Sequence, residues 1–447
     1  MREGSLEAPT RHPLAWQDPD FYDEAKLDAE MRRVFDICHG CRRCFNLCDS
    51  FPRLFDLVDA APSEELDTVR SEDFKQVVDA CTLCDMCFMT KCPYVPPHNF
   101  NLDFPHLMLR YRAVEAKKHG VPLVDRELAK TDRNGKLAAL APAVANWASD
   151  AGNGLTRPLL EKRAGLHREA ALPKYAGTSL TAQARAQAPA VNEAAPGFGR
   201  RAVLYATCFA NYNDPGIGRA ARAVLAKNGV ATEVVHPRCC GMPLLEQGDI
   251  AGVARAAAEV AAALGPWIEE GHDVIALTPS CALMLKFEWP LILPQDPAVA
   301  RLARATFDLS EYLVDIARKE GLAPGLAPMT EPVTLHIACH SRAQNMGQKG
   351  AELLRLIPEA KVTVVERCSG HGGSWGFKKR NFEVALKVGK PVARQAAKQA
   401  GGYLTSECPL AGVHIGQGME KLGGEAPKPA LVAHPVQLLA RAYGLME

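Results

Sequence analysis

The chain has 447 residues, enough for two or three domains, and 47% of them are hydrophobic, which excludes disorder as its main state. Lysine and arginine number 52 against 51 acidic residues, so the formal net charge is +1; without a clustered basic face, we expect no nucleic-acid partner. Fifteen cysteines, without a signal-like apolar run near the start, indicate a reducing compartment. We therefore expect a cytoplasmic protein whose thiols serve metals or catalysis.

The most apolar segment, residues 250–268, is rich in alanine and is interrupted by Arg255 and Glu259. It reaches a Gly-Pro pair before it could cross a bilayer. We therefore predict a helix of a globular domain that begins after Asp249, and no transmembrane segment. Peripheral attachment to the inner face of the cell membrane is compatible with this prediction.

The first 98 residues contain eight of the cysteines, in the two motifs CHGCRRCFNLC and CTLCDMCFMTKC. In two-cluster ferredoxins, three closely spaced cysteines bind one four-iron cluster, and the fourth cysteine of the motif binds the other cluster. Zinc would prefer separated pairs, and it does not explain Pro93 directly after the last cysteine. We therefore predict two [4Fe–4S] clusters within residues 1–98. The expected ligands are Cys38, Cys41, Cys44 and Cys92 for one cluster, and Cys81, Cys84, Cys87 and Cys48 for the other.

Residues 99–199 are expected to form a helical connector. The segment HLMLRYRAVEAKKHG predicts a helix that ends at Gly120, because glycine commonly follows the last turn of a helix. Residues 181–199, TAQARAQAPAVNEAAPGFG, have low complexity and are predicted to be a linker to the next domain.

The last seven cysteines reveal an internal repeat. The first copy carries the segments RRAVLYATC, RCCG and DVIALTPSC, and the second carries PVTLHIAC, RCSG and YLTSEC in the same order. In both copies, short β-branched runs alternate with helical segments, which predicts parallel βαβ units in two α/β domains, residues 200–325 and 326–447. Each of these cysteines follows a predicted strand, and the ligand sites of α/β sheets lie at that edge.

In the first copy, four thiols from three strand ends predict a third metal centre, either an iron–sulfur cluster or zinc. Adjacent cysteines cannot easily face one tetrahedral ion together, but they can flank a larger cluster, and Gly241 lets the backbone approach it. Buried cysteines that bind no metal are the alternative. The candidate ligands are Cys208, Cys239, Cys240 and Cys281.

The second copy is less complete, because Ser369 replaces the second cysteine of the adjacent pair. Its candidate metal ligands are Cys339, Cys368 and Cys408, with His340 and His371 as the nearest further donors. Such a set could hold zinc, a modified cluster or no metal, and the sequence leaves these alternatives open. The glycine-rich segment GHGGSWG, residues 370–376, lacks the Gly-Lys-Ser/Thr ending of a phosphate loop, so we expect flexible backbone beside this site.

The motifs CHGCRRCFNLC, CTLCDMCFMTKCP, RCCGMPLLEQGD, TPSCALML, ACHSRAQNMG and RCSGHGGSWGFKKRN resemble the CCG-domain family that includes the iron–sulfur C subunit of anaerobic glycerol-3-phosphate dehydrogenase. In this family an α-helical ferredoxin domain precedes two cysteine-rich CCG domains, which are similar to those of the heterodisulfide reductase B subunit and the glycolate oxidase iron–sulfur subunit. The resemblance covers residues 38–97 and 202–418 and implies the same multidomain fold here. Two features depart from the family pattern: Ser369, and the segment CPLA at residues 408–411 where a closing Cys-x-x-Cys is usual.

The resemblance implies an iron–sulfur electron-transfer subunit of an oxidoreductase. Such a subunit takes electrons from a flavoprotein dehydrogenase, or another redox protein, and passes them toward quinone or another acceptor, often at the membrane surface. Two alternatives stay open: a heterodisulfide or thiol-disulfide reductase that uses the CCG site, and an electron-transfer partner of a rubrerythrin-like diiron protein. A zinc-binding scaffold is a further hypothesis, but it gives the N-terminal clusters no role. The sequence assigns no catalytic residue and does not decide whether the chain is itself an enzyme.

Overall fold

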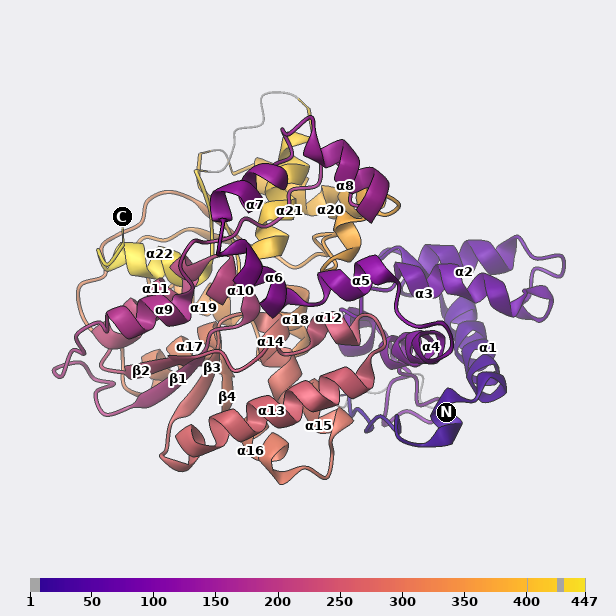
Figure 1. The fold of residues 1–447 in the computed structure, drawn as a ribbon, viewed down its shortest axis with the longest axis horizontal. Coiled ribbons are helices and arrows are strands. Elements are labelled where there is room, and N and C mark those ends of the chain that lie inside the picture. The colour runs from indigo at the N-terminus through magenta and orange to yellow at the C-terminus, as the bar shows by residue number, and fades with distance from the viewer. Residues whose placement is uncertain (1–8, 400, 424–429, 447) are drawn as a thin grey trace.

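The computed structural model describes residues 9–399, 401–423 and 430–446. Its N-terminal region, drawn in indigo and violet in Figure 1, consists of helices gathered at one side of the molecule. Aromatic side chains contribute to the core of this region, where the rings of Phe35 and Phe74 meet edge to face with their centroids 5.1 Å apart. The region is helical, but its assignment as a ferredoxin domain stays a prediction. Its elements are η1 (Pro19–Tyr22), α1 (Glu24–Cys41), α2 (Ser50–Asp59), η2 (Leu66–Thr68), η3 (Ser71–Phe74), α3 (Lys75–Ala80), η4 (Cys87–Lys91) and α4 (Phe104–His119).

The connector contains short helices, one of which lies in the predicted linker of residues 181–199. These helices are α5 (Leu123–Leu128), α6 (Thr131–Ala138), α7 (Pro142–Ala148), α8 (Thr156–Ala164) and α9 (Leu180–Ala186). Ser179 caps α9 by accepting a hydrogen bond from the N–H of Ala182 at 3.2 Å. Leu180 is fully buried and packs so closely on Gly218 that a Cβ there would clash with it. The predicted linker thus begins within a short helix that one buried leucine and a cap stabilise, and its role as a linker stays a prediction.

Two four-stranded sheets form the rest of the chain, and both have the same topology (Figure 1). The order is β2-β1-β3-β4 in the first sheet and β6-β5-β7-β8 in the second, and every neighbouring pair is parallel. The predicted repeat of parallel βαβ units is therefore confirmed. The strands are β1 (Arg201–Tyr205), β2 (Ala231–Val235), β3 (Asp273–Ala276), β4 (Thr306–Asp308), β5 (Val333–His336), β6 (Val362–Val365), β7 (Tyr403–Ser406) and β8 (Leu431–Ala433).

Helices follow the strands in both copies of the repeat. In the first copy they are α10 (Cys208–Tyr212), α11 (Pro215–Lys227), α12 (Met242–Leu245), α13 (Ile250–Glu269), α14 (Pro279–Leu283), η5 (Met284–Glu288), α15 (Trp289–Ile292), α16 (Pro297–Ala305) and α17 (Leu309–Lys319). In the second copy they are α18 (Cys339–Ala343), α19 (Lys349–Leu354), η6 (Trp375–Phe377), α20 (Phe382–Ala397), α21 (Pro409–Glu420) and α22 (Pro435–Ala442).

The inner strands β1, β3, β5 and β7 are buried at successive positions because both faces of a parallel sheet are covered. In β1, Val203 belongs to an apolar core shared with the N-terminal helices, whereas the next residue, Leu204, belongs to a second core. This second core also contains Leu225 of α11 and Leu439 of α22, which belong to different copies. Apolar packing therefore joins the two copies to each other and joins the first copy to the N-terminal region.

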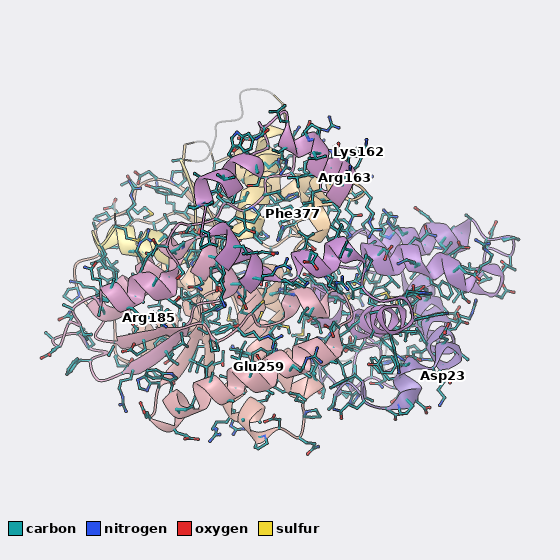
Figure 2. The ribbon with its side chains drawn as sticks, viewed as in Figure 1. Asp23, Lys162, Arg163, Arg185, Glu259 and Phe377 are labelled. Carbon is teal, nitrogen blue, oxygen red and sulfur yellow. The ribbon has the colours of Figure 1, made fainter. Side chains whose placement is uncertain are left out.

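Helix α13 contains the most apolar segment of the sequence. It begins after Asp249, as predicted, and the Asp249 carboxylate accepts a hydrogen bond from the N–H of Gly252 at 2.8 Å. Glu259 lies on its outer face, where it pairs with Arg238 at 2.6 Å (Figure 2). In the part of the chain that the structure describes, no helix is long and apolar enough to cross a membrane. Helix α4 likewise ends at the predicted Gly120.

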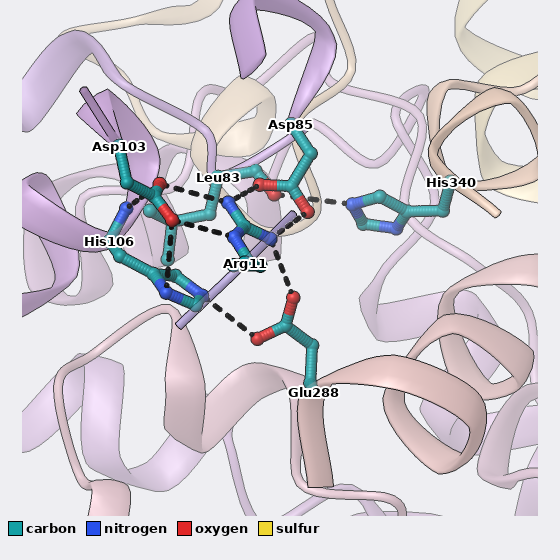
Figure 3. A network of polar contacts seen from close by, with 7 residues as sticks. All are labelled: Arg11, Leu83, Asp85, Asp103, His106, Glu288 and His340. Carbon is teal, nitrogen blue, oxygen red and sulfur yellow. Dashed lines mark hydrogen bonds and ion pairs between the residues drawn. The ribbon is translucent and has the colours of Figure 1, made fainter. Parts of the chain in front are cut away.

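A buried network of charges joins the N-terminal segment, the helical region and the first copy of the repeat (Figure 3). Arg11 donates hydrogen bonds to both carboxylate oxygens of Asp85, at 2.8 and 2.9 Å, and to those of Asp103, at 2.8 and 3.1 Å. It also donates to Glu288 of η5 at 3.0 Å. His106 contacts Asp103 at 3.3 Å and Glu288 at 3.2 Å. One guanidinium therefore holds carboxylates from three parts of the chain in a fixed arrangement.

Candidate metal centres

All fifteen cysteines lie within the described residues, and all are free thiols. The first N-terminal group lies around the end of α1 and the residue that follows η4. Burial raises the pKa of Cys38 well above its usual range, and the nearby thiols of Cys92, Cys44 and Cys41 raise it further. Burial, then Cys92 and Cys41, also raise the pKa of Cys44 to about 12. The structure therefore brings together the four residues predicted for one cluster.

The second N-terminal group combines cysteines from both motifs. Burial raises the pKa of Cys48, and the thiols of Cys84 and Cys81 add to the shift. Burial likewise raises the pKa of Cys87, followed by Cys84 and Cys81 and then by Cys44 of the first group. Cys48 of the first motif thus lies with the second motif, the exchange that two-cluster ferredoxins use. The two groups adjoin each other at Cys87 and Cys44.

The first copy of the repeat brings its four cysteines together beyond the carboxyl ends of its strands. The Sγ of Cys208, after β1, lies 3.9 Å from the Sγ of Cys239, after β2. Hydrogen bonds with Cys208 and Cys240 lower the pKa of the Cys239 thiol well below its usual value. Cys240 interacts with Cys239 and with Cys281, which follows β3, and both interactions raise its pKa. The four predicted residues therefore form one group.

Two connector residues also lie in this group, and the sequence did not single them out. Asp132 accepts a hydrogen bond from the backbone N–H of Cys239 at 2.7 Å, and its other oxygen contacts the ring of His236 at 2.7 Å. Thr131 lies beside the thiols of Cys208 and Cys239, and its hydroxyl is buried. Threonine and aspartate are common at the start of helices. In the sequence, this pair therefore indicates the start of a helix and does not indicate a contact with the thiols.

The second copy has three cysteines, after β5, β6 and β7. Burial raises the pKa of Cys339 well above its usual range, and the thiols of Cys84, Cys368 and Cys408 raise it further. The Cys368 thiol accepts a hydrogen bond from the N–H of Gly370 at 3.4 Å. The three predicted cysteines are therefore neighbours, and a thiol of the N-terminal region lies close to them.

The two histidines expected beside this second site differ in their contacts. His340 contacts the hydroxyl of Ser280 through Nδ1 at 2.8 Å and the carbonyl of Leu83 through Nε2 at 3.4 Å (Figure 3). His371 is buried, and its Nδ1 has no hydrogen-bond partner among the described residues. Burial, followed by His414 and His340, lowers the pKa of His371 to about 3, so its imidazole is neutral. Of the two, only His371 has a free ring nitrogen.

Within residues 9–399, 401–423 and 430–446, no three histidine, cysteine or acidic side chains are placed to hold one metal ion. The thiols are nevertheless gathered in sets of three or four, and each is partly or fully buried. The cysteine ligands of a four-iron cluster stand further apart than the ligands of one tetrahedral ion.

Residues 202–286 and 333–416 each match the family model of a cysteine-rich domain called CCG. Both copies of the repeat are CCG domains. The predicted resemblance is thus confirmed, and so is the duplicated α/β part of the predicted fold. The copies are called the first and second CCG domains below.

Similar proteins include two oxidoreductase subunits and a lactate utilization protein. The chain is 26% identical over 321 residues to the C subunit of anaerobic glycerol-3-phosphate dehydrogenase of Escherichia coli (strain K12), and the match covers 70% of this chain and 76% of that protein. It is 28% identical over 251 residues to the B subunit of fumarate reductase (CoM/CoB) of Methanothermobacter marburgensis, covering 55% of this chain and 47% of that protein. Lactate utilization protein A of Bacillus pumilus is 28% identical over 184 residues, or 39% of this chain and 74% of that protein.

The thiols of the second CCG domain lie between those of the N-terminal region and those of the first CCG domain. Burial, followed by the thiol of Cys368, raises the pKa of Cys84 to about 12. On the other side, burial raises the pKa of Cys408 to about 11, with smaller contributions from Glu407 and from Cys281 of the first CCG domain. The thiols of the second CCG domain are therefore within electrostatic reach of both the N-terminal thiols and those of the first CCG domain.

Arg112 of α4 links the N-terminal region to the first CCG domain. Its guanidinium donates hydrogen bonds to the carbonyl oxygens of Val78, at 2.8 Å, and of Cys81. It also donates to the carbonyl of Glu246, which follows α12, at 2.9 Å. Burial raises the pKa of Cys81, and the positive charge of Arg112 acts against this shift. A cavity of about 340 Å³ is lined by both residues.

The glycine-rich segment 370–376 lies beside the second site, as predicted, but packing restrains it. The indole of Trp375 donates a hydrogen bond to the carbonyl of Asp79 at 2.8 Å. A Cβ on Gly372 would stand 2.6 Å from Cγ2 of Thr82, so only glycine allows the two loops to touch. The expectation of flexible backbone is therefore wrong, because these contacts hold the segment against the second cysteine motif.

Proposed function

We propose that the chain is an iron–sulfur electron-transfer subunit of an oxidoreductase. The observation that carries this proposal is the series of four thiol groups, in which each group adjoins the next. Centres arranged in this way can pass single electrons from one end of the protein to the other. The names of the relatives, among them a dehydrogenase subunit and a fumarate reductase subunit, support an oxidoreductase assembly.

Two [4Fe–4S] clusters would be held by the N-terminal groups. Cys38, Cys41, Cys44 and Cys92 would bind one cluster, and Cys81, Cys84, Cys87 and Cys48 the other. Free thiols in sets of four, partly or fully buried and with no disulfide among them, are the donors that such clusters require. When bound, each cluster takes up and releases one electron at a time. Arg112 would favour the more negative, reduced state of the second cluster, because its positive charge lies near Cys81.

The first CCG domain would hold a third iron–sulfur centre at Cys208, Cys239, Cys240 and Cys281. Asp132 would position the Cys239 backbone, since it accepts that residue's N–H and is itself held by His236. We propose a flavoprotein dehydrogenase or another redox subunit as the electron donor, and quinone as a candidate acceptor. Identifying the subunits that copurify with the chain would identify the donor. It would also reveal a rubrerythrin-like diiron protein if that is the partner. A cytoplasmic location, with or without attachment to the inner face of the membrane, stays a prediction.

Anaerobic purification followed by iron, zinc and sulfide analysis tests the proposal. We expect a brown protein with at least about eight iron atoms per chain from the two N-terminal clusters, and electron paramagnetic resonance (EPR) signals after reduction. A colourless, iron-free sample prepared without oxygen would refute an electron-transfer function.

Replacing Cys240 with serine is expected to abolish the centre of the first CCG domain and to leave the N-terminal signals intact. The reason is that Cys240 interacts with both Cys239 and Cys281, so its loss divides the group. Iron analysis and EPR of the reduced protein measure the effect. Unchanged spectra would show that this centre is assigned to the wrong residues.

Replacing Asp132 with asparagine is expected to weaken metal binding in the first CCG domain by about tenfold to a hundredfold, the usual effect of losing a partner outside the ligand set. Asparagine has one side-chain oxygen where aspartate has two, so it cannot contact both the Cys239 N–H and the His236 ring through oxygen. Metal release to a chelator, followed by absorbance, measures the change. The matched control is Asp150→Asn, because Asp150 is a connector acid that pairs with Lys174 away from the thiols. Equal metal release from both variants would contradict a supporting role.

A thiol-disulfide reductase is the second candidate function, and one observation favours it. The Cys239 thiol has a lowered pKa and lies 3.9 Å from Cys208, and a lowered pKa is typical of reactive thiols. Reduction of a heterodisulfide by the purified chain, with an artificial electron donor, would distinguish a reductase from a relay. A chain that carries electrons to an acceptor without consuming disulfide is a relay.

A further inference from the structure

The second CCG domain buries an imidazole nitrogen that has no partner. His371 is only 6% exposed, and no group among the described residues forms a hydrogen bond with its Nδ1. Buried polar atoms are nearly always hydrogen-bonded, so an exception calls for an explanation such as an unfilled ligand position. A neutral histidine with a free ring nitrogen is a common metal ligand.

The ring of His371 lies among residues that adjoin all three cysteines of this domain. His371 itself comes three residues after Cys368. It is within electrostatic reach of His340, which follows Cys339, and of His414 in α21, the helix that begins after Cys408. The ring centroids of His371 and His414 are 6.4 Å apart. His371 therefore lies in the same part of the second CCG domain as residues that follow the three cysteines.

The backbone around His371 is held in place by its neighbours. The carbonyl of His371 accepts a hydrogen bond from the N–H of Gly376 at 3.0 Å, and its ring lies 5.6 Å from the ring of Phe377. Gly370 has φ +80° and packs so tightly on the carbonyl of Ala385 in α20 that a side chain there would clash. The orientation of the imidazole is therefore set before any ligand binds.

We propose that His371 supplies the fourth ligand of an iron–sulfur cluster whose other ligands are Cys339, Cys368 and Cys408. This inference rests on the proposed function and extends it to the incomplete second site. His340 is excluded because both of its ring nitrogens already contact other groups. Histidine thus replaces a thiolate that the second copy lacks.

A neutral imidazole in place of a thiolate makes the cluster less negative. Less negative clusters accept an electron more readily, as the histidine-ligated Rieske centres illustrate. This centre lies between Cys84 of the N-terminal region and Cys281 of the first CCG domain. We therefore expect it to be reduced at a higher potential than a cluster with four cysteine ligands at the same position.

Pulsed EPR of the full-length protein, purified without oxygen and reduced with dithionite, tests the ligand directly. The wild type is expected to show strong nitrogen-14 coupling from a coordinated imidazole. His371→Gln should lose that coupling together with about four iron atoms. His371→Cys should keep the iron, because a thiolate replaces the imidazole, but should lose the coupling and be reduced at a lower potential. His340→Gln is the matched control and should keep both iron and coupling.

Nitrogen coupling that persists in His371→Cys would overturn the assignment, and His414→Gln would then identify the rival donor, because Nε2 of His414 is also buried and has no hydrogen-bond partner in the described part of the chain. A wild type with clusters but no strong nitrogen coupling, or with zinc at this site, would also overturn it. A wild type that contains no iron–sulfur cluster at all would refute the proposed function itself. The N-terminal cluster signals report whether each variant is folded, and His371→Cys remains informative if His371→Gln is not.

Discussion

Replacing Cys84 with serine is expected to remove about four iron atoms from the chain and to interrupt electron transfer between the N-terminal region and the CCG domains. Cys84 belongs to the second thiol group and also adjoins Cys368, whose thiol adds to burial in raising the pKa of Cys84 to about 12. A serine hydroxyl does not replace the thiolate as an iron ligand. Iron and sulfide analysis would measure the loss of the cluster. EPR would measure the loss of magnetic coupling between the second N-terminal cluster and the second CCG domain.

Cys44→Ser is the matched control for this experiment. It is expected to remove the other N-terminal cluster, because Cys44 lies with Cys92 and Cys41. It should preserve the contact between Cys84 and Cys368 and therefore the coupling between the second N-terminal cluster and the second CCG domain. If Cys84→Ser retained that coupling while Cys44→Ser lost it, the order of the series would be wrong.

Replacing Arg11 with glutamine is expected to lower the free energy of unfolding by about 3 to 5 kcal/mol, the cost of removing one partner from a buried ion pair. The Arg11 side chain is 12% exposed and holds Asp85, Asp103 and Glu288, which would otherwise repel one another (Figure 3). The loss should be visible in urea unfolding of the anaerobic protein, followed by circular dichroism. It should also expose the second cysteine motif, because Asp85 is part of that motif.

The matched control is Arg70→Gln. Arg70 also pairs with a carboxylate, that of Asp73, but its side chain is 73% exposed. Exposed ion pairs contribute little, so we expect no measurable change in unfolding. Equal destabilisation by the two substitutions would mean that burial of the Arg11 network does not determine its effect.

The Arg11 network also makes a prediction about acid stability. Burial disfavours the charged form of Asp103, but His106 and Arg11 outweigh this effect and lower its pKa to about 2. A carboxyl whose pKa is lowered on folding stabilises the protein above its unfolded pKa, near 3.8, and this contribution is lost as the pH falls through about 2. In Arg11→Gln the acid transition should therefore move to higher pH than in the wild type.

The sequence alone determined the local features of this protein. Cysteines at intervals of three residues imply two groups of four thiols, and the structure gathers the same two sets. Alternating β-branched and helical segments predicted two parallel sheets with a cysteine after each relevant strand, and both sheets are present. The start of α13 after Asp249 and the end of α4 at Gly120 were also predicted. Such features follow from side-chain spacing, caps and turns, which depend on residues close together in the chain.

Only the tertiary structure decided how these parts meet. It places Cys368 beside Cys84 and Cys281 near Cys408, although each pair is far apart in the sequence. It adds Asp132 to the first thiol group, and it distinguishes the engaged His340 from the unpartnered His371 in the second. These contacts arise between loops that are far apart in the sequence, so no periodic pattern in the sequence predicts them. Burial and long-range packing therefore determine the order of the thiol groups, whereas local spacing determines only which residues belong to each group.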